Sequence, residues 1–220
     1  RGMRKRRREQ KLIVAGCMAQ RFSKELPGAM PEVDAFIGLD QVTNVATVID
    51  ELYARERDAS AAAATPALRG PVPNLVNGRS TFIPDYDTPR FRLTPRHFAY
   101  IKIAEGCNHP CSFCIIPQVR PHLVSRPLEH IVDEVCRLVD RGYREVVLTG
   151  IHLGHYGVEW NRGAPKCRWT RLSHLVRRLA ELPGDFRVRL SSIEATEVTR
   201  ELIDAMADHP EKVAPHLHIS

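Results

Sequence analysis

Strand-like and helix-like segments alternate from residue 98 to the end of the chain, and this alternation restricts the possible folds more than any other feature. Short apolar runs typical of buried strands occupy residues 99–104, 145–150, 186–192 and 216–220. Apolar residues at helical spacing occupy residues 128–141, 170–182 and 198–207. Helices between successive strands predict an α/β protein with a parallel sheet, open or curled into a partial (β/α) barrel. In such sheets the loops that follow the strands carry the chemistry.

A second α/β region precedes this one. Strands are predicted at residues 11–15 and 34–37, and helices at residues 20–26 and 42–57. We therefore interpret residues 1–57 as the C-terminal part of a domain with its own parallel sheet. Residues 58–97 are rich in Ala, Pro, Gly and Ser, which predicts a linker or an extended crossover. The chain begins without Met, and an apolar alternation is still running at its last residue. We expect truncation at both ends, with an incomplete barrel over residues 98–220.

The charge balance is compatible with an anionic partner. The formal net charge of +6 suits nucleic acid, but it suits an ordinary solvated surface equally well. The basic run at residues 1–10 could be a nucleic-acid arm, although we favour a helix that leads into the first strand. No apolar run approaches the ~20 residues needed to span a bilayer, and the start lacks a signal-peptide pattern. We therefore expect a cytoplasmic protein without a membrane segment.

Half of the six cysteines lie in one short loop, GCNHPCSFCIIP, directly after the first barrel strand. Cys107, Cys111 and Cys114 have the spacing C-x3-C-x2-C. Disulfides suit neither an odd number of thiols nor a chain without a signal peptide. Structural zinc requires a fourth ligand, which His109 or His122 could supply, but the spacing fits no common zinc finger. Three thiolates could instead hold an iron–sulfur cluster and leave one iron open.

Two further loops at strand ends could contact a ligand. Glycines in LTGIHLGHYG allow a close approach of the backbone, whereas His152 and His155 in the same loop are interpreted as polar residues without a role. In RLSSIEATEVT, Ser192 and Glu194 could hold a ribose or an amine. The competing interpretation of that segment is a helix start, with Thr196 or Thr199 as the N-cap and Thr199 favoured.

The segment KIAEGCNHPCSFCIIP resembles the cysteine motif of the radical S-adenosylmethionine (SAM) enzymes. The resemblance implies that Cys107, Cys111 and Cys114 bind a 4Fe–4S cluster whose open iron chelates the amino and carboxylate groups of SAM. It also implies that an electron from the cluster cleaves SAM to a 5′-deoxyadenosyl radical. The SAM contacts implied by the resemblance are Phe113, Thr149, Gly150, Ser192 and Glu194.

Longer segments resemble the methylthiotransferases within that superfamily, namely SRPLEHIVDEV, GYREVVLTGIHLGHYG, RLSSIEATEVT and PHLHIS. VAGCMAQR resembles the end of their N-terminal domain, which implies that Cys17 is one of three ligands of an auxiliary 4Fe–4S cluster. The other two ligands would lie upstream of Arg1. The implied transferase uses SAM twice, once to methylate a sulfur and once to remove a hydrogen, and converts C–H to C–SCH3. We expect a monomer with an electron donor such as flavodoxin or ferredoxin.

Different segments resemble different branches of this family. The barrel loops resemble the branch that acts at C2 of N6-threonylcarbamoyladenosine beside the tRNA anticodon. DAFIG and TPRHFAYIKIAEGCNHPC resemble the branch that modifies an aspartate of a small-subunit ribosomal protein. Because loops at strand ends line the substrate site, we favour tRNA as the partner, with a ribosomal protein as the alternative. A zinc-containing RNA-binding module is the second alternative.

One position beside the cysteine loop departs from the family pattern. Where the family has glycine, this chain has Pro121, which lacks an amide hydrogen and has a fixed φ. The remaining cysteines, Cys136 and Cys167, are interpreted as structural or incidental.

Overall fold

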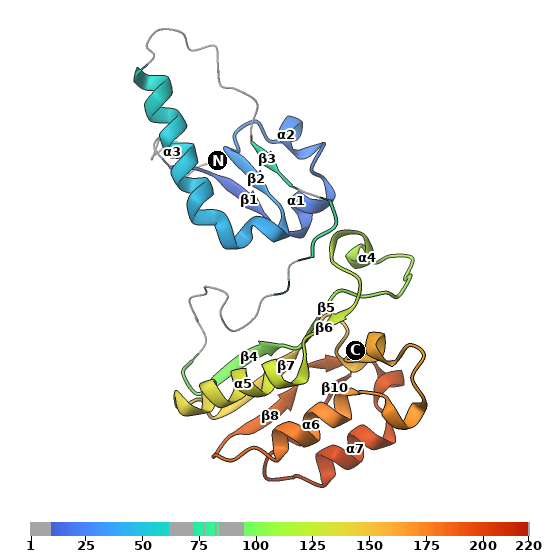
Figure 1. Ribbon diagram of the computed structural model, residues 1–220. Helices are drawn as coiled ribbons and strands as arrows, with labels where there is room; N and C mark the ends of the chain where they lie inside the picture. Colours follow the sequence, from blue (N-terminus) through green and yellow to red (C-terminus); the bar gives the residue numbers. More distant parts are fainter. Residues whose placement is uncertain (1–9, 62–72, 77, 82, 84–94, 220) are drawn as a thin grey trace. The chain divides into compact units, whose positions relative to one another are not determined.

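The computed structural model describes residues 10–61, 73–76, 78–81, 83 and 95–219. The chain forms two compact units. The first comprises residues 1–82 and 118–120, and the second comprises residues 83–117 and 121–220. Figure 1 shows a sheet in each of them, and the two units are described separately below.

The first unit is a small parallel sheet with helices. Its strands are β1 (Ile13–Ala15), β2 (Ala35–Ile37) and β3 (Asn74–Leu75), in the order β1-β2-β3. Its helices are α1 (Cys17–Arg21), α2 (Leu26–Ala29), the 3-10 helix η1 (Leu39–Asn44) and α3 (Val45–Ala61). β2 is buried along its whole length, and its Ala35 and Ile37 pack against Val48 and Leu52 of α3. An amphipathic helix on a parallel sheet is the arrangement that the alternation in this region predicts.

Two features of this unit differ from the sequence expectations. The helix expected at residues 20–26 is replaced by α1 and α2. Pro27 lies in the first turn of α2, where its missing N–H costs nothing. The segment expected to be a linker contributes β3, which pairs with β2 from Phe36↔Asn74 to Ile37↔Leu75. The residues on both sides of β3, 62–72 and 84–94, lie outside the described part of the chain.

The second unit contains a parallel sheet covered by three helices. Its strands are β4 (Phe98–Lys102), β7 (Glu145–Thr149) and β8 (Arg187–Leu190), in the order β4-β7-β8, together with a parallel pair of β9 (Ser192–Ile193) and β10 (His218–Ile219). The helices are α5 (Leu128–Asp140), α6 (Leu172–Ala180) and α7 (Arg200–Ala207). The order and the parallel register confirm a mixed α/β fold with a partial barrel. Figure 1 shows α5 and α6 beside the sheet.

The core of the second unit lies between this sheet and its helices. Ile101, Leu148 and Leu190 lie in register on adjacent strands and are almost completely buried. The apolar faces of α5 and α6 pack against them and belong to the same hydrophobic cluster. α7 begins at Thr199, whose hydroxyl accepts a hydrogen bond from Leu202 N at 3.2 Å, which confirms the expected N-cap.

The first barrel strand is shorter than the sequence predicts. It ends at Lys102, and the chain then forms β5 (Ala104–Glu105), which pairs antiparallel with β6 (Val124–Ser125). The three cysteines lie between these two short strands, before α4 (Ile116–Val119). After β6, the buried guanidinium of Arg126 bonds to Glu134 of α5 at 2.7 Å and to the Lys102 carbonyl at 2.9 Å. The base of the cysteine loop is therefore fixed to β4 and α5.

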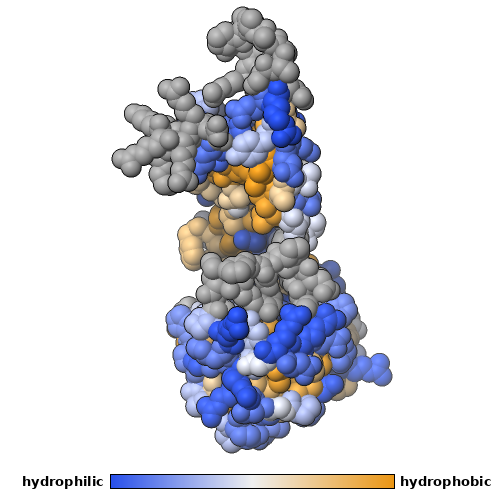
Figure 2. All heavy atoms as spheres, turned by 90° about the vertical axis from the view of Figure 1, so that its left-hand side faces the viewer, coloured by the Kyte–Doolittle hydropathy of each residue, from blue (hydrophilic) through white to orange (hydrophobic). Residues whose placement is uncertain are grey.

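Short 3-10 helices occupy the loops at the strand ends. They are η2 (Leu153–His155), η3 (Val158–Asn161), η4 (Lys166–Arg168) and η5 (Ala195–Glu197). On the face seen in Figure 2 the second unit is mostly hydrophilic, as expected for a solvated surface. Among the described residues, no helix combines the length and the apolar character that crossing a membrane requires.

Candidate metal centre

The cysteine loop places three free thiols on one segment of backbone. Cys107 and Cys114 are partly buried, and Cys111 is exposed. The Cys114 amide donates to the Cys111 carbonyl at 3.1 Å, and the His109 amide donates to Cys107 Sγ at 3.4 Å. A backbone N–H directed at sulfur is a common feature of thiolate ligands, since it stabilises their negative charge. Three thiols from one loop match the ligand set of a 4Fe–4S cluster with one open iron.

The loop is closed tightly at its base. Gly106 has φ +77°, and a Cβ built on it would lie 2.1 Å from the Pro121 carbonyl oxygen. The side chain of Asn108 accepts a hydrogen bond from Leu123 N at 3.0 Å, which joins the start of the segment to its end. Glycine is therefore required at position 106 both by its conformation and by the space available.

The loop after β7 brings a buried histidine to the first cysteine. His152 is 4% exposed, and its Nδ1 lies 3.4 Å from Cys107 Sγ. Its ring stacks on that of His155 with centroids 3.9 Å apart and an interplanar angle of 11°. The ring of His109 meets it edge-on at 4.5 Å. His152 and His155, interpreted from the sequence as polar residues without a role, are packed together beside the first cysteine.

A buried carboxylate completes this group of side chains. Glu197 Oε1 contacts Nε2 of His152 and lies 3.1 Å from Nε2 of His155, while the Glu197 side chain is only 7% exposed. Burial raises the pKa of Glu197, but the hydrogen bond from His152 and the charges of the nearby imidazoles outweigh it, and the net pKa is lowered. Burial lowers the pKa of His155, and the charge of His152 lowers it further. Glu197 is therefore a carboxylate at neutral pH, and the pKa of His155 lies below its ordinary value.

Gly154 makes room for this carboxylate. A Cβ at position 154 would lie 2.2 Å from Glu197 Oε2 and 2.5 Å from Glu197 Cβ. Its φ is not positive, so the requirement for glycine here is steric. The glycine at position 154 therefore allows η5, the 3-10 helix that carries Glu197, to pack closely against this loop.

Hydrogen bonds to β6 hold the histidine loop near the cysteine loop. Gly157 N donates to Ser125 Oγ at 2.8 Å, and Ser125 Oγ donates to Glu159 Oε2 at 3.1 Å. The buried hydroxyl of Tyr156 donates to the Arg126 carbonyl at 2.9 Å. Because β6 also closes the cysteine loop, bonds to β6 and to Arg126 directly after it position both loops.

Only part of the expected set of SAM contacts is close to the cysteines. Thr149 ends β7 and donates to the Ile101 carbonyl at 3.2 Å, and Gly150 follows it beside Ala104. A Cβ at position 150 would lie 3.4 Å from the Ala104 carbonyl oxygen, which is tight but feasible. Phe113 extends from the cysteine loop with 91% of its surface exposed. These three residues lie at a strand end or on the cysteine loop, as expected. Their described contacts do not indicate which group of a ligand each would bind.

The remaining two expected contacts follow β8. Ser192 lies in β9, and its hydroxyl is 2.9 Å from His218 Nδ1 of β10. Glu194 is half-exposed, and its Oε1 lies 3.8 Å from His152 Nε2. The structure therefore links Glu194 to the cysteine loop through His152, a neighbour that sequence reasoning missed. The HxxH spacing of His152 and His155, on a loop at a strand end, was the available signal.

The other cysteines occupy different surroundings. Cys17 is the first residue of α1 in the first unit, after Gly16 with φ +106°, and its thiol is free and partly buried. Cys136 packs against the core of the second unit from α5. Cys167 is exposed on η4.

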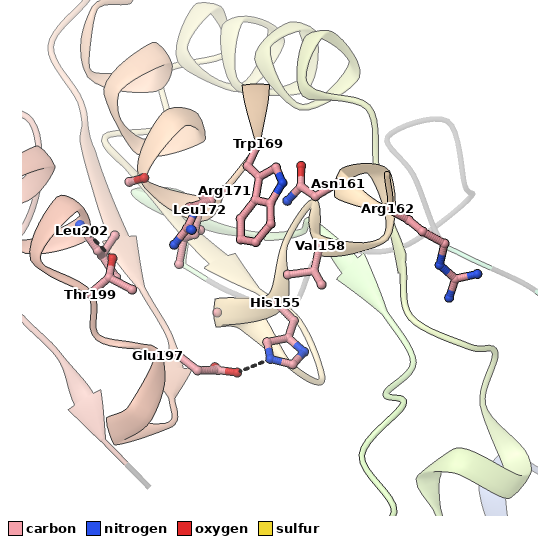
Figure 3. A pocket seen from close by; sticks show the side chains of 12 residues that line it. His155, Val158, Asn161, Arg162, Trp169, Arg171, Leu172, Glu197, Thr199 and Leu202 are labelled. Atoms are coloured by element: carbon pink, nitrogen blue, oxygen red, sulfur yellow. Dashed lines mark hydrogen bonds and ion pairs between the residues drawn. The ribbon is translucent and has the colours of Figure 1, made fainter. Parts of the chain in front are cut away.

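A pocket of about 460 Å³ adjoins the histidine loop. His155 and Glu197 form part of its wall, and Figure 3 shows Trp169 and Leu172 on another side. The Arg171 guanidinium lies 5.0 Å from the centre of the Trp169 ring. The carboxylate that bonds to the histidines thus also faces a cavity large enough for a side chain of a partner or a small ligand.

Comparisons with known proteins agree with the cysteine motif and the fold. The model of the Radical SAM superfamily matches residues 101–220. Among solved structures, the radical SAM methyltransferase TsrM from Kitasatospora setae, with tryptophan and a SAM analogue bound, has a TM-score of 0.51. The match covers 92% of this chain and 40% of that one at 14% identity, so it bears on the fold alone.

Two curated relatives with high identity to this chain carry the same name. The ribosomal protein uS12 methylthiotransferase RimO of Opitutus terrae is 53% identical over 100% of this chain and 46% of its own length. The protein of the same name from Akkermansia muciniphila is 40% identical over 96% of this chain and 45% of its own length. The chain therefore spans about half the length of the curated relatives it matches.

These relatives contradict the expectation of a tRNA substrate. That expectation gave most weight to the short barrel loops, whereas similarity along the entire chain favours the ribosomal-protein branch. Loops such as TGIHLGHYG are shaped by packing as well as by the substrate, as Gly154 against Glu197 illustrates. Their resemblance to the other branch was therefore a poor guide to the substrate.

Proposed function

This chain belongs to the radical SAM superfamily and to its methylthiotransferases, and on that premise we propose that the protein methylthiolates ribosomal protein uS12. The observation that carries the proposal is a loop with three free cysteines in a chain 53% identical to a uS12 methylthiotransferase. The modified group is an aspartate, the residue on which the ribosomal-protein branch acts, and C–H becomes C–SCH3 there.

The thiols of Cys107, Cys111 and Cys114 hold a 4Fe–4S cluster in this proposal. When bound, the cluster supplies the electron for the reductive cleavage of SAM. The chain's own contribution is to present three thiolates from one segment and to stabilise the first of them with the His109 amide. A cluster with only three protein ligands keeps one iron free for SAM.

In this proposal, residues at the strand ends would hold SAM. Thr149 and Gly150 offer backbone groups at the end of β7, and Ser192 and Glu194 offer a hydroxyl and a carboxylate after β8. Glu194 has the best support, because it lies 3.8 Å from the histidine that contacts Cys107. Phe113 is exposed enough to cover an adenine or a methionyl group.

The first unit contributes to a second 4Fe–4S cluster in this proposal. Residues 1–57 form the end of the auxiliary-cluster domain, residues 58–97 connect it to the radical SAM domain over residues 98–220, and Cys17 is one ligand. The strand–Gly–Cys turn supports this role, because Gly16 with φ +106° turns the backbone directly before a free thiol. We place the protein in the cytoplasm as a monomer, with a flavodoxin or a ferredoxin as its electron donor.

Mass spectrometry of uS12 tests the proposal directly. In a strain that lacks the gene, uS12 should be lighter by the mass of one methylthio group less that of one hydrogen, and the full-length wild-type gene should restore the mass. A gene with Cys107, Cys111 and Cys114 all changed to Ala should express protein but restore nothing. An unchanged uS12 mass in the deletion strain, or purified protein that holds stoichiometric zinc without iron, would contradict the proposal.

A further inference from the structure

One segment of the second unit carries positive charge that none of its own residues balances. Residues 160–171, WNRGAPKCRWTR, run from the end of η3 through η4 to the start of α6, and we call them the basic segment. They include four basic residues, two tryptophans and no Asp or Glu. Arg162, Lys166 and Arg168 are exposed, and none of the three has an ion-pair partner within the part of the chain that the structure describes.

Several arginines elsewhere in the unit face a carboxylate at the surface. Arg144 lies 2.9 Å from Asp185 Oδ2, and Arg200 lies 2.8 Å from Asp204 Oδ1. Such pairs balance their own charge and leave little for a partner to recognise. The three unpaired cations of the basic segment, by contrast, are grouped within seven residues and attract a polyanion.

Hydrogen bonds fix the shape of the basic segment. The side-chain amide of Asn161 donates to the Thr170 carbonyl at 2.8 Å and accepts from the Thr170 amide at 2.7 Å. This contact is buried and joins the two ends of the segment. The Trp169 indole donates to the Ala164 carbonyl at 2.8 Å across its middle. The cations are therefore carried by a loop that is folded before a partner arrives, so that binding does not have to order it.

The basic segment also presents an aromatic ring to solvent. Trp160 is 42% exposed, and its ring meets that of the buried Tyr156 edge-on, with centroids 5.5 Å apart. Proteins that bind single-stranded nucleic acid combine cations along the backbone with aromatic rings on which bases stack. The basic segment has both components within a short stretch of chain.

We propose that the basic segment binds RNA of the ribosomal subunit beside uS12, with Arg162, Lys166 and Arg168 on phosphates and Trp160 against an unstacked base. The choice of ribosomal RNA rests on the proposed function, since uS12 is a ribosomal protein. The RNA is held by the enzyme and is not modified. The basic segment thus recognises the particle in which the target aspartate is presented.

The basic segment adjoins the candidate metal centre. Asn161 and Trp169 line the same pocket as His155 and Glu197 (Figure 3). In that view the Arg162 side chain extends away from the pocket, so a phosphate on its guanidinium would leave the cavity open. RNA bound to the segment would therefore lie next to the loops that surround the cysteines, without blocking the approach of the target protein.

An acidic protein segment is the competing partner, because charge alone suits carboxylates as well as phosphates. The exposed indole favours RNA. A carboxylate offers Trp160 no flat apolar surface, whereas every base has a face that stacks on an aromatic ring. The two partners therefore differ in whether Trp160 contributes to binding.

The salt dependence of RNA binding tests the phosphate contacts. The probe is a fluorescein-labelled single-stranded RNA of mixed sequence, about 20 nucleotides long, and the protein is full-length and reconstituted. Each phosphate contact contributes about 0.7 to the slope of the logarithm of affinity against the logarithm of salt concentration. The triple variant Arg162→Gln, Lys166→Gln, Arg168→Gln should therefore reduce that slope by about 2.

A matched triple variant controls for the loss of charge. Arg144→Gln, Arg177→Gln and Arg200→Gln remove the same charge from arginines that pair with Asp185, Asp208 and Asp204. This control should keep the wild-type slope. An unchanged slope in the basic-segment variant, or an equal decrease in the control, would overturn the inference.

Substitution of Trp160 separates RNA from an acidic protein. Trp160→Leu should weaken RNA binding about fivefold or more without changing the salt slope, and Trp160→Phe should restore much of the affinity. Unchanged affinity in Trp160→Leu, with polyglutamate displacing the RNA at equal charge concentration, would establish an acidic protein partner and overturn the inference.

Activity on two forms of uS12 links the basic segment to the reaction. Small subunits from the deletion strain and isolated uS12 serve as substrates. The basic-segment variant should have a kcat/KM about tenfold lower on subunits and a wild-type value on isolated uS12. Equal kcat/KM values on subunits, or a wild-type enzyme that modifies isolated uS12 only, would overturn the inference. Wild-type protein that binds RNA as expected but modifies neither form would instead overturn the proposed function.

Discussion

The α-carbon of Gly106 packs against the carbonyl oxygen of Pro121, so closely that a Cβ would lie 2.1 Å from that oxygen. This contact joins the residue before the first cysteine to the residue that departs from the family pattern. It uses only the backbone carbonyl of Pro121, a group that every residue possesses. The proline is therefore compatible with the closed loop.

Gly106→Ala should prevent cluster loading. The new methyl group would displace the Pro121 carbonyl, and φ +77° is unfavourable for alanine. We expect iron per chain to fall to less than half of the wild-type value after reconstitution. Gly142→Ala is the matched control, because Gly142 has φ +87° but open space around it. The control should lose about 1 kcal/mol of stability and retain its iron, and equal iron loss in both variants would contradict the steric explanation.

Pro121→Gly should load a normal cluster. The carbonyl that faces Gly106 remains in this variant, and the family pattern itself has glycine at this position. Iron content and the EPR spectrum are expected to match those of the wild type. A large loss of iron would mean that the fixed φ of proline, rather than its carbonyl, shapes the loop.

Gly154→Ala should displace Glu197 and destabilise the second unit. The added Cβ would overlap the carboxylate side chain at 2.2 Å, and overpacking of this kind typically costs about 1–3 kcal/mol. Urea unfolding of the full-length protein measures the loss. Gly28→Ala adds a methyl group in open space within α2 and should change stability little or increase it. Similar losses in the two variants would argue against the contact with Glu197.

Glu134→Ala should be among the most destabilising substitutions in α5. Glu134 and Arg126 are almost fully buried, and removal of one partner leaves a buried charge, which typically costs about 3–5 kcal/mol. The exposed pair of Arg200 and Asp204 offers a comparison at 2.8 Å, and Arg200→Ala should cost about 0.3–0.5 kcal/mol. Chemical denaturation of both variants measures the loss of unfolding free energy. It tests whether that loss depends on the burial of the ion pair or only on its presence.

Acid should weaken the contact between β7 and β8. The bidentate hydrogen bond from Arg189 holds the pKa of Glu145 below its ordinary value of 4.5. Since the folded pKa is the lower one, the contribution to stability is complete above pH 4.5 and is lost as pH falls through the folded pKa. Both side chains are partly exposed, so we expect about 1 kcal/mol or less. Glu145→Gln should flatten the pH dependence of stability below pH 4.5, and an unchanged slope would contradict this assignment.

Elements with long, regular patterns were predictable from the sequence. The strand expected at residues 145–150 is Glu145–Thr149, and the helix expected at residues 128–141 is Leu128–Asp140. Short elements were not, because two residues such as Asn74–Leu75 carry no periodic signal and become a strand only by pairing with β2. Tertiary pairing also ends β4 at Lys102, where the chain turns to pair with β6.

The cysteines of the candidate site were predictable, but the residues that surround them were not. C-x3-C-x2-C is a local spacing, and its resemblance to the radical SAM motif can be recognised without knowledge of the distant residues around it. The contact of His152 with Cys107 spans 45 positions, and that of Glu197 with His152 depends on the approach of η5 to a different loop. Such neighbours are determined by the order of strands in the sheet.

The antiparallel pair of β5 and β6 has a consequence for the order of assembly. Because these strands meet at the base of the cysteine segment, the segment leaves the barrel and returns to the same place. The barrel strands β4, β7 and β8 pair with one another without using any residue between Glu105 and Val124. The three barrel strands can therefore pair before the cysteine segment receives its iron and sulfide. Cluster insertion would then be a late step that takes place on a folded sheet.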